Sequence, residues 1–212
     1  MNVQGFVESA LWLCEWIMRL AYVNLLWLLF TLAGMIVFGI APATAALFSV
    51  QVKWSTGDVT SPIFRTFWKN YKASFLKANL LGYFLAIVGW LLYFNLTFFA
   101  THDGVINKIV GLITLTVAIW YLITLFYSFP IYASYNLKTI RIIKNAFIVG
   151  MLNPILTFGM ILSSGSVIFI VLYFPKLLLF FGISLPCLMI MLFSNQVFQK
   201  IDDLKERSPE LA

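Results

Sequence analysis

Charged side chains are scarce in this sequence. Lys, Arg, Asp and Glu make up 10% of its 212 residues, and hydrophobic residues make up 62%. Soluble domains carry about 25% charged residues and roughly 45–50% apolar ones. A large soluble core would also need amphipathic segments and polar loops, whereas the long runs here are apolar on all sides. The composition therefore excludes an ordinary soluble protein and indicates one that is surrounded by lipid.

Residues that bind metals or carry out catalysis are also scarce. Cys14 and Cys187 lack metal-type spacing, and we expect both to be buried thiols without a disulfide. The single histidine, His102, falls in a short polar turn, where a surface role is commoner than a ligand role. The patterns HExxH, GxSxG and GxxxxGK[ST] are absent. We therefore predict no cofactor, no metal site, no catalytic residue and no enzymatic activity.

The third scarcity is of charge inside the apolar runs. Intramembrane acids and bases mark proton relays and ion pathways, so their absence argues against an ion-coupled pump. An uncharged apolar run of about 20 residues, folded as a helix, spans a bilayer core of about 30 Å. The sequence predicts an all-α, polytopic transmembrane bundle over a single domain, 1–212. Its five spans are about 20–38, 78–101, 109–129, 153–174 and 177–199.

Prolines set the expected helix limits. The uncharged run 20–52 is too long for one span, and Pro42 should start a second short helix over 43–54. Pro130 should kink or end the third span, and Pro154 should begin the fourth. Pro186 should interrupt the fifth. Before the first span, residues 1–19 mix tryptophans with charges, which is typical of a short interfacial helix rather than a secretory signal.

Basic residues fix the expected orientation, because cytoplasmic segments of membrane proteins are enriched in Lys and Arg. The basic segment 53–77 lies between two apolar runs and should be cytoplasmic. Threading five spans from it places the amino terminus outside and the carboxyl terminus inside the cell membrane. The inner residues are then Lys53, Arg65, Lys69, Lys72, Lys77, Lys138, Arg141, Lys144, Lys200, Lys205 and Arg207, and the outer ones are Arg19, Lys108 and Lys176. The net charge of +6 thus indicates anionic lipid headgroups as partners and not nucleic acid.

Within the basic segment, Ser61 and Pro62 predict a capped helix start. An aromatic stripe follows at helical spacing, formed by Phe64, Phe67, Trp68, Tyr71 and Phe75. A basic row lies beside it, formed by Arg65, Lys69 and Lys72. Two interpretations stay open. The helix lies in the membrane surface and contacts lipid, or it docks on its own protein with solvated lysines. The candidate lipid-contacting residues are Arg65, Trp68, Lys69 and Lys72.

Two further sets of residues are candidates within the spans. Small residues at helical spacing permit close helix contact, and these are Gly82, Ala86, Gly89, Gly159 and Ser163. A cavity for a sugar or lipid is the sharper hypothesis for Trp90, Tyr93, Asn95, Trp120 and Tyr121. The alternative is that these aromatic residues are ordinary membrane-interface residues and that Asn95 makes a helix hydrogen bond.

Two elements carry a family resemblance: Pro-Ala-Thr-Ala-Ala at 42–46 and Phe-Trp-Lys-Asn at 67–70. With them the chain resembles the YesL-like family of bacterial membrane proteins, a family defined by a domain of unknown function. The resemblance covers nearly the whole chain and is strongest over 20–82. It implies a Gram-positive source and an association with polysaccharide and sugar-uptake systems, and it transfers no catalytic residue.

The expected function is an accessory component linked to carbohydrate uptake or utilisation. It would pack against a carbohydrate permease through the small-residue faces of the second and fourth spans. The alternative is a small sugar-type transporter with its own cavity near Asn95 and Trp120. Co-purification with a permease would favour the first, and sugar flux in liposomes would favour the second.

Overall fold

Every regular element in the computed structural model is a helix, within the backbone of residues 3–207 and the side chains of residues 7–202 that it describes. This confirms the all-α prediction. The helices in chain order are α1 (Val3–Ala33), α2 (Ile40–Ser55), α3 (Ile63–Thr101), α4 (Val105–Ser134), α5 (Thr139–Leu152), α6 (Pro154–Tyr173), α7 (Pro175–Phe181) and α8 (Ser184–Arg207).

Four of these helices, α1, α3, α4 and α6, are long and apolar enough to cross a bilayer. The short α7 and the start of α8 together form a fifth candidate span that is bent by 57°. Helices satisfy their own backbone hydrogen bonds and so can be surrounded by lipid. The described part of the chain therefore has four candidate membrane spans, or five if the bent pair counts as one.

Two of the expected helix limits are wrong. The segment 1–19 is not a separate interfacial helix, because α1 runs unbroken from Val3 to Ala33 and ends before residue 38. The basic helix and the second span are likewise one helix, α3, of 39 residues. At 1.5 Å per residue α3 is about 58 Å long, nearly twice a bilayer core. A change from charged to apolar residues does not end a helix when strong helix formers, here Leu76, Lys77 and Ala78, lie at the change.

The prolines behave according to their position in a helix. Pro42 and Pro154 lie in the first turns of α2 and α6, as predicted. Pro130 is buried inside α4, which continues to Ser134, so it does not end the span at 129. Pro186 lies in the first turn of α8, just after the break. Ser61 makes no capping bond to α3, since Pro62 is the N-cap residue and the Ser61 hydroxyl binds Asp58 instead.

The turn between α1 and α2 contains strained backbone. Met35 and Ile36 have φ of 55° and 62°, in the left-handed region that residues other than glycine seldom adopt. Polar side chains of α3 hydrogen-bond carbonyl groups at the end of α1 and in this turn. The bonds are Tyr71 Oη to Phe30 O (3.1 Å), Asn79 Nδ2 to Phe38 O (3.0 Å) and Tyr83 Oη to Val37 O (3.4 Å). Non-helical backbone is tolerated at membrane depth only when protein groups satisfy it in this way.

The break between α7 and α8 is also satisfied by side chains. Asn24 of α1 is buried, and its Oδ1 accepts the N–H groups of Ile183 and Ser184, each at 3.0 Å. Its Nδ2 donates to Leu179 O at 2.7 Å. From α2, Gln51 Nε2 donates to Ser184 O at 2.8 Å. A carboxamide on each of two other helices therefore holds the break in place.

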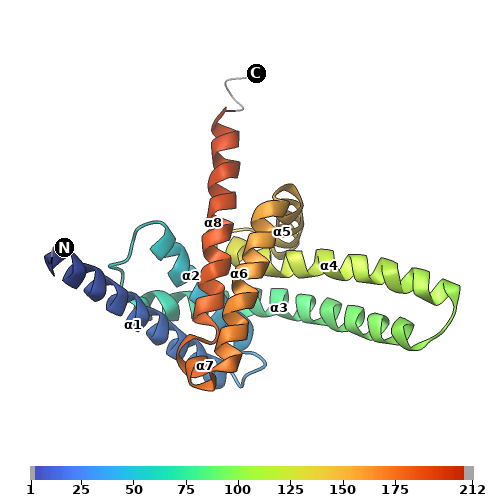
Figure 1. Cartoon of the computed structure of the whole chain (residues 1–212), viewed down its shortest axis with the longest axis horizontal. Coiled ribbons are helices and arrows are strands. Elements are labelled where there is room, and N and C mark those ends of the chain that lie inside the picture. The colour runs from blue at the N-terminus through green and yellow to red at the C-terminus, as the bar shows by residue number, and fades with distance from the viewer. Residues whose placement is uncertain (1–2, 208–212) are drawn as a thin grey trace.

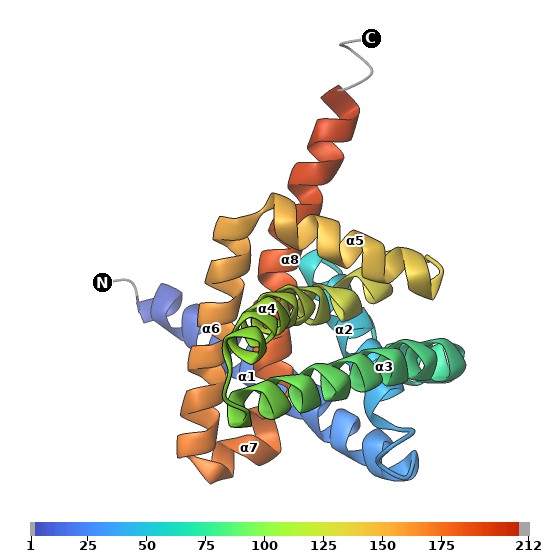
Figure 2. The same ribbon diagram turned by 90° about the vertical axis from the view of Figure 1, so that its right-hand side faces the viewer.

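The core lies around α2, whose alanines let neighbouring helices approach closely. Ala43, Ala45 and Ala46 are fully buried. In Figure 1 α6 and α8 run side by side, while α3 and α4 form a hairpin that extends away from them at a steep angle; in Figure 2 the hairpin points obliquely toward the viewer. Cys187 is buried as expected, but Cys14 is exposed on α1, because that face of the helix has no protein neighbour.

Candidate functional site

The aromatic stripe of α3 packs against its own protein. Phe67 is fully buried, and Tyr71 is 7% exposed. The Phe30 ring of α1 lies 5.3 Å from the Phe67 ring, 5.2 Å from the Trp68 ring and 5.0 Å from the Tyr71 ring. Of the two interpretations left open by the sequence, the docked helix describes this face.

The basic row beside the stripe remains exposed. Arg65, Lys69 and Lys72 are exposed, and the Lys72 ammonium lies 4.0 Å from the centre of the Trp68 ring. A cation over an indole is attracted by the negative face of the ring. Contact between this row and anionic headgroups therefore stays a prediction, with Trp68, 37% exposed, at its edge.

Three of the five small-residue positions lie against other helices of this chain. A methyl group added at Gly82 would lie 2.7 Å from the Ala41 methyl, one at Gly89 would lie 2.6 Å from the Tyr121 hydroxyl, and one at Gly159 would lie 3.0 Å from the Phe193 ring. By contrast, Ala86 is exposed and Ser163 donates to Met160 O in its own helix. The glycine faces are therefore occupied internally and do not offer a surface to a permease.

The five candidate cavity residues do not come together. Trp90 and Tyr93 are 65% and 69% exposed on the outer surface of α3. Asn95 donates to Leu91 O within the same helix. Only the two residues from α4 contact other elements: Trp120 packs on Phe147, and Tyr121 donates to Leu85 O at 2.6 Å. This arrangement gives no support to a cavity among the five.

A polar cleft lies elsewhere, between α2, α3 and the segment that joins α4 to α5. It consists of two adjoining hollows of about 340 and about 240 Å³, which share Lys77, Tyr132, Asn136 and Leu137. The first hollow adds Ser49, Asn70, Ala73, Ser74, Ala133, Ser134 and Tyr135, and the second adds Lys138 and Thr139. Among the described residues no acid lines either hollow. Hydroxyls, carboxamides and two ammonium groups make the lining suitable for an anionic or polyhydroxyl group.

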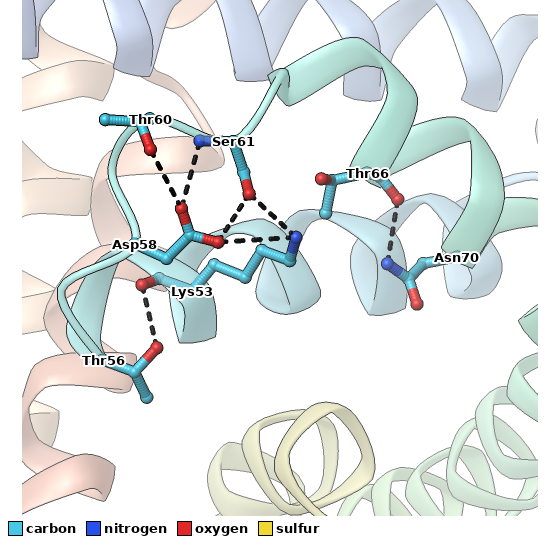
Figure 3. Close-up of polar contacts among 7 residues, drawn as sticks. All are labelled: Lys53, Thr56, Asp58, Thr60, Ser61, Thr66 and Asn70. Carbon is cyan, nitrogen blue, oxygen red and sulfur yellow. Dashed lines mark hydrogen bonds and ion pairs between the residues drawn. The ribbon is translucent and has the colours of Figure 1, made fainter.

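Several of the cleft's polar groups already have partners, but one buried hydroxyl and two lysines have none among the residues whose side chains the structure describes. Ser49 donates to Ala45 O. Asn70 donates one amide hydrogen to Thr66 O, a bond that Figure 3 shows. The Ser134 hydroxyl oxygen is buried, yet within the described part of the chain it has no hydrogen-bond partner. Lys77 and Lys138 have no carboxylate partner among those same residues.

The sequence did not reveal the cleft, because its lining comes from segments far apart in the chain. Lys77 and Lys138 were interpreted only as markers of orientation. One local feature could have drawn attention to it: the polar stretch 132–136 follows an apolar span and directly precedes a basic helix. The family element 67–70 ends at Asn70, which lines the cleft.

An apolar cavity of about 370 Å³ lies on the other side of the same segment. It shares Tyr135 and Leu137 with the cleft, and most of its other lining comes from α5 and the end of α8. Burial raises the pKa of the Tyr135 phenol, and the neighbouring Asp202 carboxylate acts in the same direction. A polar and an apolar hollow therefore meet at residues 135–137.

The loop between α2 and α3, which leads into this region, is fixed by Asp58 (Figure 3). Its carboxylate accepts the Ser61 hydroxyl at 2.5 Å and the Ser61 N–H at 3.1 Å, and the Lys53 ammonium lies 3.7 Å away. The bond from the Ser61 hydroxyl is the largest of the effects that lower the pKa of Asp58.

Comparison with known proteins gives relatives but no activity. Residues 20–96 match the family described as a protein of unknown function, DUF624. Three uncharacterized proteins of Bacillus subtilis (strain 168) are similar along most of their length: YteU (37% identity over 87% of this chain and 83% of the relative), YesV (36%, 89% and 91%) and YesL (30%, 92% and 91%). No solved structure matches the chain.

Proposed function

From the premise that this chain belongs to the YesL-like (DUF624) family of proteins of unknown function, we propose that it is a non-enzymatic accessory component of the cell membrane. The proposed role is in carbohydrate uptake or utilisation, in a Gram-positive bacterium, beside a carbohydrate permease. The carbohydrate link rests on the family resemblance of the sequence.

The observation that supports an accessory role is the projecting α3–α4 hairpin. Its outer half extends away from the other helices (Figure 1). Large apolar side chains are exposed around it, among them Ile87 (60%), Trp90 (65%), Tyr93 (69%), Phe94 (57%), Ile109 (55%) and Leu112 (66%). Trp and Tyr are the residues that most often anchor protein interfaces. A helical membrane partner would cover one side of the hairpin, and lipid would cover the rest.

The orientation proposed for the chain is amino terminus outside and carboxyl terminus in the cytoplasm. In Figures 1 and 2 α5, which carries Arg141 and Lys144, lies beside the carboxyl-terminal half of α8, which carries Lys200. Lys176 lies in the first turn of α7, at the opposite end of α6. This distribution agrees with the enrichment of cytoplasmic ends in basic residues. The side chains of Lys205 and Arg207 lie outside the described residues.

A second candidate function is a small transporter of sugar-type solutes. The polar cleft favours it, because its first hollow of about 340 Å³ offers hydroxyl and carboxamide groups to a polar solute. This site replaces the cavity expected near Asn95 and Trp120.

Site-specific crosslinking in cells tests the accessory role. A photoreactive phenylalanine at Trp90 or Tyr93 should crosslink to a carbohydrate permease. The same group at Phe169 of α6, which is 71% exposed, is the matched control and should crosslink to no protein. If neither hairpin position gives a protein adduct, lipid alone covers the hairpin and the accessory role is rejected. Sugar flux into liposomes that contain only this protein would instead support the transporter.

A further inference from the structure

We propose that the polar cleft is a binding site for a phosphate group, carried either by the headgroup of an anionic lipid or by a small soluble phosphate ester. The site is independent of the accessory role. It is built from Lys77 of α3, Lys138 and Thr139 at the start of α5, and Ser134 at the end of α4.

The first argument is charge. Lys77 and Lys138 line the same hollow and have no carboxylate partner among the described residues. Two ammonium groups left without a counter-charge favour an anion between them. A phosphate monoester fits this pair better than a carboxylate, because it carries up to two negative charges and three acceptor oxygens. The phosphodiester of a lipid headgroup carries one negative charge, like a carboxylate, but its phosphorus bears two ester groups and its acceptor oxygens are arranged tetrahedrally.

The second argument is the start of α5. The first N–H of this helix to bond a backbone carbonyl is that of Arg141, which bonds Lys138 O. The N–H groups of Thr139 and Ile140 therefore have no backbone acceptor in the described chain, as is usual in a first helical turn. Such groups, together with the positive end of the helix dipole, bind phosphate in many proteins.

The carboxyl end of α4 opposes this effect, since it also reaches the cleft. Its carbonyl groups amount to about half a negative charge, which the amino end of α5 offsets with about half a positive one. The two full lysine charges then decide the sign, and the cleft is positive.

The third argument is the Ser134 hydroxyl. Its oxygen is buried at the cleft and unpartnered among the described residues. Natural proteins seldom leave a buried polar group unpaired, because its lost hydration is not replaced. The residue lines the hollow while its oxygen has no exposed surface, so a change of the Ser134 rotamer would bring the hydroxyl to a phosphate oxygen, which would supply the missing acceptor.

The experiment is a titration of the full-length protein, purified in detergent and stripped of lipid. One arm uses inorganic phosphate and glycerol 3-phosphate, measured by calorimetry. The other arm uses phosphatidylglycerol in mixed micelles. Binding of the soluble probes identifies a soluble ester as the source, and binding of phosphatidylglycerol alone identifies a lipid. Acetate is the comparison anion, and we expect it to bind about tenfold more weakly than the phosphate probe.

Two double variants with the same change in charge locate the site. Lys77→Gln with Lys138→Gln should weaken binding at least about tenfold. Arg141→Gln with Lys144→Gln, on the same basic helix but outside the cleft, should leave it unchanged. The proposal is overturned if the wild type binds neither probe, if acetate binds as tightly as phosphate, if the first double variant binds normally, or if both double variants weaken binding equally.

Ser134→Ala gives a test that does not depend on charge. Removing an unpaired buried hydroxyl should raise the midpoint of thermal unfolding of the ligand-free protein, whereas loss of a phosphate contact should weaken binding. These effects have opposite signs, so a merely structural serine would not produce both. Unchanged binding in this variant would remove the serine from the site and contradict the proposal as stated.

Discussion

Asn24 makes three hydrogen bonds to backbone groups around the break between α7 and α8. Among the described residues, it alone bonds backbone groups on both sides of the break between α7 and α8. The sequence shows only that a polar residue lies within the first expected span. It could not show that the partners are backbone groups, because the break itself depends on how the carboxyl-terminal helices fold back onto α1.

We predict that Asn24→Leu lowers the free energy of unfolding by about 1–3 kcal/mol. The lower end reflects hydrogen bonds in membranes, about 0.6 kcal/mol each, and the upper end reflects buried N–H groups left unpaired. The measurement is denaturant unfolding in mixed micelles. Asn95→Leu is the control, since Asn95 is exposed and bonds only its own helix. Equal losses in both variants would show that the Asn24 contacts are not special.

Asp58 gives a pH dependence to the loop between α2 and α3. Its folded pKa lies below its ordinary value, so the stabilisation from its bonds is present above about pH 4 and is lost as the pH falls through the lower folded pKa. We predict that the protection factor of the Ser61 amide against hydrogen exchange falls between about pH 6 and about pH 3. In Asp58→Asn it should be low at both values. A wild-type protection factor that does not change with pH would contradict this assignment.

At the scale of elements, α2 and α3 approach each other closely at Ala41 and Gly82. A methyl group at Gly82 would lie 2.7 Å from the Ala41 methyl, well inside van der Waals contact. We predict that Gly82→Ala destabilises the protein by about 1–3 kcal/mol through overpacking. Ala41→Gly added to it should recover most of that loss, because it removes the opposing methyl group.

Gly165→Ala is the matched control for that pair. A methyl group there meets nothing within 4 Å, so the substitution should change stability little, or raise it by up to about 1 kcal/mol through helix propensity. Thermal unfolding of the four proteins in one detergent gives the comparison. If Gly82→Ala is as stable as Gly165→Ala, or if Ala41→Gly gives no recovery, the close approach is not real.

The helices themselves were largely predictable from local features. The lengths of the uncharged apolar runs indicated where the spans lie. Pro42 and Pro154 indicated two helix starts, because a proline in the first helical turn leaves no N–H group unpaired. At Pro130 the sequence predicted a kink or an end of the helix, and α4 does not end there but continues to Ser134, because a proline removes only one helical hydrogen bond. The expectation that one helix ends and another begins between Lys77 and residue 78 was wrong. Only the charge changes there, and polarity does not determine backbone conformation.

The sites were less predictable than the helices. The small residues Gly82, Gly89 and Gly159 were found by their spacing, but their partners could not be assigned to this chain or to another. The cleft depends on Lys77 and Lys138 lying in one hollow although they are distant in sequence. That proximity follows from the packing of α2, α3 and α4, which no local pattern encodes.

For the whole molecule, the direction of the α3–α4 hairpin is the main unexpected feature. Composition predicts a bundle of roughly parallel spans, and helices in membranes tilt by about 20° on average. In Figure 1 the hairpin instead leaves the α6–α8 pair at a steep angle, and its outer half has no neighbour in the described chain. A surface of this size, apolar on every side, is covered by lipid or by a partner, and this is why the crosslinks at Trp90 and Tyr93 test the accessory role.

The central claim is that this polypeptide crosses the cell membrane with its basic rows and polar cleft on the cytoplasmic side. Single cysteines test it most directly, in a background where Cys14 and Cys187 are replaced by Ala. A membrane-impermeant maleimide added to intact cells should label Lys176→Cys, and should label Lys144→Cys only after the cells are permeabilised. Labelling of Lys144→Cys in intact cells, with Lys176→Cys protected, would contradict the account.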